Sequence, residues 1–173
     1  IAWLWQSGLG IGDRDYYLQA SQQNTRDKYV EMMTEMFKLS GYGKMVNMEG
    51  QEAELANAVL KLETAMAEKF MDKNTMRDPF KTHNIRTIDQ LQNMLPAIDV
   101  KEYLKAQGLG SLESVNVGQV DYISSLSQIL RNTDLNTIKA YLAWQVIDAA
   151  ASYLSHDFVD ASFNFYGKVL SGK

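Results

Sequence analysis

The sequence has 173 residues, of which 46% are hydrophobic and 22% charged, a composition typical of a folded domain rather than a disordered chain. The formal net charge of −4 disfavours nucleic-acid binding, which needs a basic surface. Cysteine is absent, which excludes disulfides, thiol nucleophiles and thiolate metal sites. No apolar run approaches the roughly 20 residues that a transmembrane helix requires, so we expect no membrane span.

Helical spacing of apolar residues predicts two long helices in the first half of the chain. The first is expected to begin at Thr25, a suitable N-cap, and to stop at Gly41. Its apolar stripe is Tyr29, Met32, Met33, Met36 and Phe37. The second is expected over residues 49–71, and its stripe is Leu55, Ala56, Val59, Leu62, Met66 and Phe70. Glu63 lies inside this second stripe.

A carboxylate inside an apolar stripe needs a partner, because an unpaired buried charge is costly. We therefore expect Glu63 to form an ion pair with an arginine, the candidates being Arg14, Arg77 and Arg86. Asp148 lies in another apolar stretch and carries the same expectation. Both carboxylates are interpreted as structural rather than catalytic.

Shorter elements are predicted between residues 87 and 120. Thr87 and Gln90 have capping-box spacing and begin one short helix. A second short helix is expected over residues 99–108. Residues 112–120 alternate apolar and polar side chains, the one convincing strand pattern in the sequence.

The last third of the chain returns to helical spacing, beginning with a helix that contains Tyr122 and Leu130. Residues 133–154 form the longest candidate and are apolar on most sides, so we expect a central buried helix. Ser155 is expected to cap a final helix that carries Phe158, Val159, Phe163, Tyr166 and Leu170. The predicted fold class is all-α, with at most a small β element.

Residues that could carry chemistry are few. His83 and His156 lie far apart in the sequence, and no His-Glu-x-x-His or Gly-x-Ser-x-Gly pattern occurs. We interpret Ser155-His156-Asp157 as the start of a helix rather than as a catalytic group. The sequence therefore predicts no catalytic residue, no metal ligand and no cofactor-binding residue within the chain, and it does not identify substrate-binding residues.

The stretch GLGIGDRDYYL, residues 8–18, has three glycines in five positions. It lacks the full G-x-G-x-x-G pattern of a dinucleotide-binding loop. We expect a tight turn in which Gly8, Gly10 and Gly12 adopt backbone angles closed to other residues. The tyrosines that follow, Tyr16 and Tyr17, are expected to fill space beside the turn and to keep a hydroxyl for a partner.

Four stretches in the same order resemble the neprilysin-like family of zinc metallopeptidases, in its bacterial endopeptidase O form. Residues 8–18 resemble the family's Gly-Leu-Pro-x-Arg-Asp-Tyr-Tyr segment, with Gly12 in place of proline. MRDPFKTHNIRTIDQLQ (76–92) resembles its Arg-Asp-Pro region, with His83 where tyrosine is usual. TDLNTIKAYLAWQVI (133–147) and FNFYGKVLSG (163–172) are similar to two later segments.

The resemblance implies that residues 1–173 are a segment of the non-catalytic helical lobe, which walls the substrate chamber of an enzyme that cleaves oligopeptides. The residues that hold the zinc cofactor of that enzyme would lie outside this chain. The catalytic domain would lie there too, and it is the expected partner of this segment within a longer polypeptide. Such a segment should expose an apolar patch where the rest docks. The implied location is extracytoplasmic in a bacterium, with the cytoplasm as the alternative. A free-standing helical binding module is the alternative function.

Overall fold

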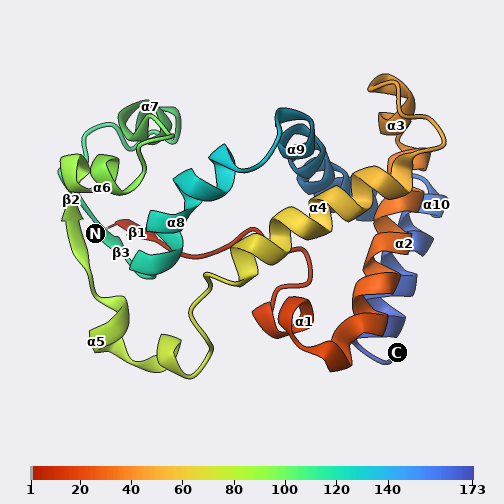
Figure 1. The fold of residues 1–173 in the computed structure, drawn as a ribbon, viewed down its shortest axis with the longest axis horizontal. Helices are drawn as coiled ribbons and strands as arrows, with labels where there is room; N and C mark the ends of the chain where they lie inside the picture. The colour runs from red at the N-terminus through yellow and green to blue at the C-terminus, as the bar shows by residue number, and fades with distance from the viewer. Residues whose placement is uncertain (1) are drawn as a thin grey trace. The chain divides into compact units, whose positions relative to one another are not determined.

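The computed structural model describes residues 2–173 and contains ten α-helices and one small sheet within that range. The all-α fold class with a small β element is therefore confirmed. The chain divides into two compact units, each drawn within the ribbon of Figure 1. The first unit comprises the segment that ends at Gly8 together with Ala65–Asn132. The second unit comprises Leu9–Thr64 and Thr133–Lys173.

A three-stranded sheet organises the first unit. Its strands are β1 (Ala2–Leu4), β2 (Ile85–Thr87) and β3 (Ser114–Val117). The order is β1-β3-β2, with β1 parallel and β2 antiparallel to the central β3. Ala2 lies opposite Val115, and Ile85 lies opposite Asn116. The strand predicted within residues 112–120 is thus confirmed as β3, whereas the edge strands have three residues each, too few for an alternating pattern to be visible.

The central strand is buried on both faces, which the alternating pattern did not predict. Val115, Asn116 and Val117 are at most 3% exposed. The buried Asn116 amide is satisfied, because its Oδ1 accepts from the Asn84 backbone N–H at 2.5 Å and its Nδ2 donates to the Thr82 carbonyl at 2.8 Å. These bonds fix the chain before β2 onto β3.

The first unit adds short helices, two of which begin where predicted, at residues 87 and 99. They are η2 (Thr75–Arg77), α5 (Pro79–Thr82), α6 (Ile88–Met94), α7 (Val100–Ala106) and α8 (Val120–Arg131). Thr87 and Gln90 form the reciprocal bonds of a capping box at the start of α6. Asp99 accepts from the Glu102 backbone N–H at 2.9 Å and begins α7, and Gly108 follows its end with φ of 73°.

The second unit contains the longer helices. They are α1 (Arg14–Leu18), η1 (Ala20–Gln22), α2 (Gln23–Leu39), α3 (Tyr42–Met45), α4 (Glu52–Ala67, whose last residues belong to the first unit), α9 (Leu135–Ala150), η3 (Ala151–Tyr153), α10 (His156–Ser162) and the π-helix η4 (Phe163–Leu170). Figure 1 shows α10 running beside α2, against which it packs.

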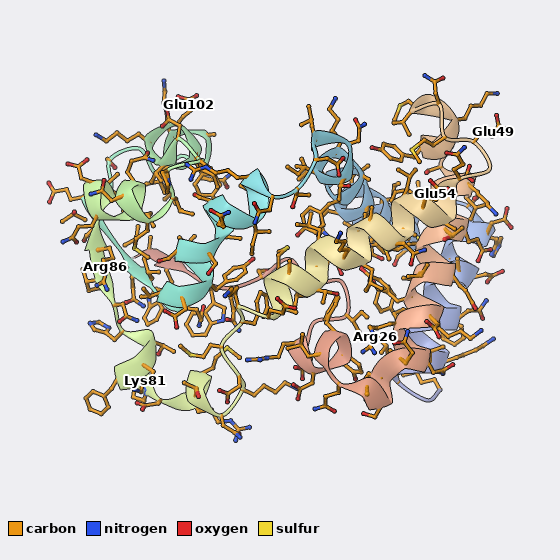
Figure 2. All side chains as sticks on the ribbon, viewed as in Figure 1. Arg26, Glu49, Glu54, Lys81, Arg86 and Glu102 are labelled. Atoms are coloured by element: carbon orange, nitrogen blue, oxygen red, sulfur yellow. The ribbon has the colours of Figure 1, made fainter. Side chains whose placement is uncertain are left out.

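The two predicted stripes form much of the core. Every residue of the two stripes is at most 7% exposed. The second helix, expected over residues 49–71, is α4 and spans only Glu52–Ala67, so Phe70 lies in the turn beyond its end. Helix α2 begins at Gln23, two residues before the predicted cap at Thr25, because the turn η1 leads directly into it. Gly41 follows the end of α2 with φ of 71°, as predicted. Arg26, labelled in Figure 2, donates to the carbonyl oxygens of Tyr16 at 2.7 Å and Gln19 at 2.8 Å, which joins α1 to α2.

The expectation of a central buried helix over residues 133–154 is wrong. In α9 only Ala140 and Trp144 are buried, whereas Leu142 is 57% exposed and Val146 is 70% exposed. The helix is apolar on two faces, and the second unit covers one of them.

The predicted final helix is also interrupted. It begins as α10 and continues from Phe163 as the π-helix η4. Ser155 occupies the predicted N-cap position, but its side chain makes no capping hydrogen bond.

Candidate functional site

A buried carboxylate lies at the centre of the second unit. Glu63, on α4, is 0% exposed. Its Oε2 accepts from the Tyr17 hydroxyl at 2.5 Å and from the Gly10 backbone N–H at 3.3 Å. The Tyr29 hydroxyl lies 3.0 Å from Oε1 and 3.1 Å from Oε2. The predicted arginine partner is wrong: within residues 2–173, the hydrogen-bonding partners of Glu63 are two hydroxyls and an amide. We name Gly10, Tyr17, Tyr29, Glu63 and Trp144 the Glu63 cluster.

Two chains of hydrogen bonds end at this carboxylate. The Ile11 backbone N–H donates to the Tyr17 hydroxyl at 3.0 Å, and that hydroxyl donates to Glu63. The Trp144 indole N–H donates to the Tyr29 hydroxyl at 2.9 Å, and that hydroxyl also donates to Glu63. Each hydroxyl therefore accepts one bond and donates another, which satisfies these polar groups inside an apolar core.

The glycine-rich turn fits around the cluster. Gly8 has φ of 103° and Gly12 has φ of 79°, so the predicted reason for these two glycines is confirmed. Gly10 is required for a different reason, because a Cβ there would lie 1.9 Å from the Tyr29 hydroxyl oxygen. The absent side chain lets the Gly10 amide approach the carboxylate.

A second carboxylate, that of the half-buried Asp148 on α9, is close enough for its charge to act on Glu63. The Tyr166 hydroxyl is 3.0 Å from Asp148 Oδ2 and 3.3 Å from the Gly10 carbonyl oxygen, and its single proton serves one acceptor at a time. Within residues 2–173, the hydrogen-bonding partner of Asp148 is this tyrosine, so the expectation of an arginine is wrong here too. Burial raises the pKa of Asp148, although the bond from Tyr166 opposes that shift.

The electrostatics of the cluster follow from burial. Burial raises the pKa of Glu63 from 4.5 to about 7, and the charge of Asp148 adds to this effect. The hydrogen bonds from Tyr17, Gly10 and Tyr29 act in the opposite direction. Burial and the neighbouring Glu63 charge raise the pKa values of Tyr17 and Tyr29, so both hydroxyls stay protonated and can donate at neutral pH. The arrangement suits a structural anchor, as predicted for Glu63, rather than an exposed catalytic acid.

The remaining candidate residues are dispersed. His83 ends α5 in the first unit and His156 begins α10 in the second, and both are exposed. Within residues 2–173, no three side chains of the His, Cys, Asp or Glu type gather closely enough to hold a metal ion. None of the helices described here has the length and apolar character needed to cross a membrane. The extracytoplasmic location stays a prediction.

An apolar pocket of about 320 Å³ lies within the first unit. Residues of β1, β3, α6, α7 and α8 line it, among them Trp3, Leu91, Tyr103 and Leu126. Tyr103 is the one titratable side chain in its lining. The pocket can hold an apolar group and offers little for acid–base chemistry.

One face of α9 is exposed although it is largely apolar. We name it the α9 stripe; its members are Leu135, Lys139, Leu142, Val146 and Ala149, all exposed. Leu135 is 63% exposed and Val146 is 70% exposed. Two large apolar residues shortly after α9, Tyr153 and Leu154, are also exposed. The docking patch expected of such a segment stays a prediction, and the α9 stripe is its candidate.

Residues 1–173 match a family model described as Peptidase family M13. The chain therefore belongs to peptidase family M13, and the resemblance to neprilysin-like peptidases is confirmed.

Its relatives are longer proteins. Rat endothelin-converting enzyme 1 is 28% identical over 165 residues, which cover 92% of this chain and 21% of that enzyme. Neprilysin-11 of Caenorhabditis elegans is 24% identical over 179 residues, which cover 95% of this chain and 20% of that protein. The chain thus spans about a fifth of the length of the curated relatives it matches.

Solved structures agree with the family assignment. The open state of the Mycobacterium tuberculosis zinc metalloprotease Zmp1 matches with a TM-score of 0.89 and 26% identity, over 99% of this chain and 26% of Zmp1. The complex of Zmp1 with an inhibitor matches with a TM-score of 0.87 and 28% identity, over 97% of this chain and 25% of Zmp1.

Substitution of Gly10 tests the fit of the turn. We expect Gly10→Ala to destabilise the protein by about 1–3 kcal/mol, because the new methyl group would overlap the Tyr29 hydroxyl. Urea denaturation measures the loss, and faster amide exchange in residues 8–18 locates it. Gly110→Ala is the matched control, because its Cβ would meet its nearest neighbour at an ordinary 3.5 Å. Equal stability of the two variants would contradict the prediction.

The raised pKa of Glu63 predicts a pH-dependent stability. Because the folded state binds the proton more tightly than the unfolded state, the stabilising effect is present below pH 4.5 and lost as the pH rises through about 7. Relative to Glu63→Gln, which does not titrate, the natural protein should lose about 2.5 kcal/mol between pH 5 and pH 8.

The comparison requires the free energy of unfolding of both proteins at several pH values. Asp148 titrates in both, so its effect largely cancels in the difference. A difference that does not change with pH would show that Glu63 has an ordinary pKa.

Proposed function

We propose that this chain forms part of the wall of the substrate chamber in a zinc metalloendopeptidase that hydrolyses oligopeptides. It contributes structure and size exclusion rather than chemistry. The observation that supports this proposal most strongly is the match of 99% of the chain to a quarter of a zinc metalloprotease, with a TM-score of 0.89. The family match over residues 1–173 is consistent with the same role.

Hydrogen bonds between the helices of the second unit support its proposed role as a rigid part of the chamber wall. Hydrogen bonds of the Glu63 cluster join α1, α2, α4 and α9. The bond between Tyr166 and the half-buried Asp148 joins η4 to α9. A chain held in this way can limit the size of a substrate and position it without touching the reacting atoms. Rigid positioning is the contribution we assign to these residues.

The described residues do not fit a zinc site, since they bring no suitable ligand group together. In such a peptidase, bound zinc polarises the scissile carbonyl and activates water. We place the zinc ligands in the part of the polypeptide outside residues 1–173. The catalytic domain would lie there and would bind the peptide substrates at the zinc.

Size exclusion can be tested with the whole protein. One susceptible peptide sequence is presented as a free oligopeptide and again within a flexible loop of a stable folded carrier. We expect kcat/KM to be at least about a hundredfold lower for the carrier, because a folded domain cannot enter an enclosed chamber. The control is the same carrier, unfolded and divided into short fragments that contain the loop sequence. These fragments should be cleaved, which shows that the fold of the carrier caused the protection. Equal rates on the free peptide and the folded carrier would refute a chamber.

If the zinc site lies outside residues 1–173, this chain alone should have no peptidase activity. Residues 1–173 alone should neither bind zinc stoichiometrically nor cleave peptides, whereas the whole protein should do both and lose activity with a chelator. Metal analysis and a fluorogenic peptide assay measure the two properties. Chelator-sensitive turnover by residues 1–173 alone would refute the assignment. A whole protein without peptidase activity would favour the alternative, a helical binding module.

A further inference from the structure

The α9 stripe has the spacing of a helix-packing surface. Its members follow one another at intervals of four, three, four and three residues along the chain. On an α-helix this spacing places side chains on one face, in a continuous row along the axis. Such a row packs against a second helix, whose side chains fill the spaces between its own. The face on the other side of α9 is already used, since Trp144 is buried and donates to Tyr29.

The exposure of this row is energetically unfavourable. Leu135, Leu142 and Val146 are between 57% and 70% exposed. Burying the exposed apolar area of these side chains would stabilise the protein, because it removes that area from water. Lys139 is the single charged member, and within residues 2–173 no ion pair is formed by it. A partner that covers the row must therefore be apolar along most of its length and acidic at one point.

The lengths of the relatives indicate where this partner comes from. This chain covers 20–26% of the related proteins, so most of a protein of that length lies outside residues 1–173. A segment of the same polypeptide is present at a far higher effective concentration than a second molecule. This argument rests on the proposed function, in which the chain is part of a longer peptidase.

We propose that the α9 stripe is the docking surface for a helix of the same polypeptide from outside residues 1–173. That helix places apolar side chains against Leu135, Leu142 and Val146, and an acidic side chain near Lys139. The 16 residues of α9 extend for about 24 Å, so the contact involves three or four turns of the partner helix. The docked helix completes the burial of α9 that its sequence predicts.

Site-specific photo-crosslinking in the whole protein tests this proposal. Benzoylphenylalanine replaces Val146, and an equal mixture of isotopically light and heavy protein is irradiated and analysed by mass spectrometry. We expect crosslinks to one helical segment outside residues 1–173, without mixed isotopes. Asn136 is the matched control position, because it is exposed on α9 but lies off the stripe. Its crosslinking yield to that segment should be several-fold lower.

Each other result would overturn the proposal. Mixed-isotope crosslinks would identify a second copy as the partner, and crosslinks confined to residues 1–173 would show that the row is covered from within. Absence of crosslinks at Val146 would show that it is uncovered. Peptidase activity is measured on the same protein, so an active enzyme with any of these results would refute the docking surface while leaving the proposed function intact.

A charge exchange gives a second readout. Lys139→Glu should lower the melting temperature of the whole protein more than Asn136→Glu. The glutamate at position 139 would face the acidic side chain of the docked helix and be repelled by it, whereas a glutamate at position 136 would not. Lys139→Gln should have an intermediate effect. Equal effects of Lys139→Glu and Asn136→Glu would contradict the acidic partner.

Discussion

The burial of one carboxylate constrains the second unit more than any other interaction. Removing Glu63 from water is costly, and the cost is offset because donors from Gly10, Tyr17 and Tyr29 surround it. Each donor belongs to a different part of the chain: the glycine-rich turn, α1 and α2. Trp144 of α9 extends the network through Tyr29. The position of the turn is therefore set by the same hydrogen bonds that join four helices.

The sequence predicted local structure well because local structure depends on nearby residues. The stripes of α2 and α4 follow from helical spacing, and the starts of α6 and α7 follow from Thr87 and Asp99. A buried role for Glu63 also followed from its place within a stripe. Its partner did not, because either an arginine or a pair of tyrosines can supply hydrogen bonds to a buried carboxylate. Tyr17 and Tyr29 are 46 and 34 positions away, and only the fold brings them together.

Two further differences have the same origin. The edge strands β1 and β2 depend on pairing with β3, which no three-residue sequence can reveal. Helix α9 is apolar enough to be buried, but hydropathy does not tell whether the covering side chains belong to these 173 residues or to the rest of a longer protein. The one usable signal for Tyr29 was its place as the only hydroxyl in the α2 stripe.

This member of peptidase family M13 has a buried polar anchor inside one unit and an exposed apolar row on α9. An experimental structure of the whole protein, at a resolution that places side chains, tests the anchor most directly. It should show the Tyr17 and Tyr29 hydroxyls and the Gly10 amide within hydrogen-bonding distance of the Glu63 carboxylate. A Glu63 side chain that faces solvent, or that pairs with a basic residue, would contradict this account of how the turn is held.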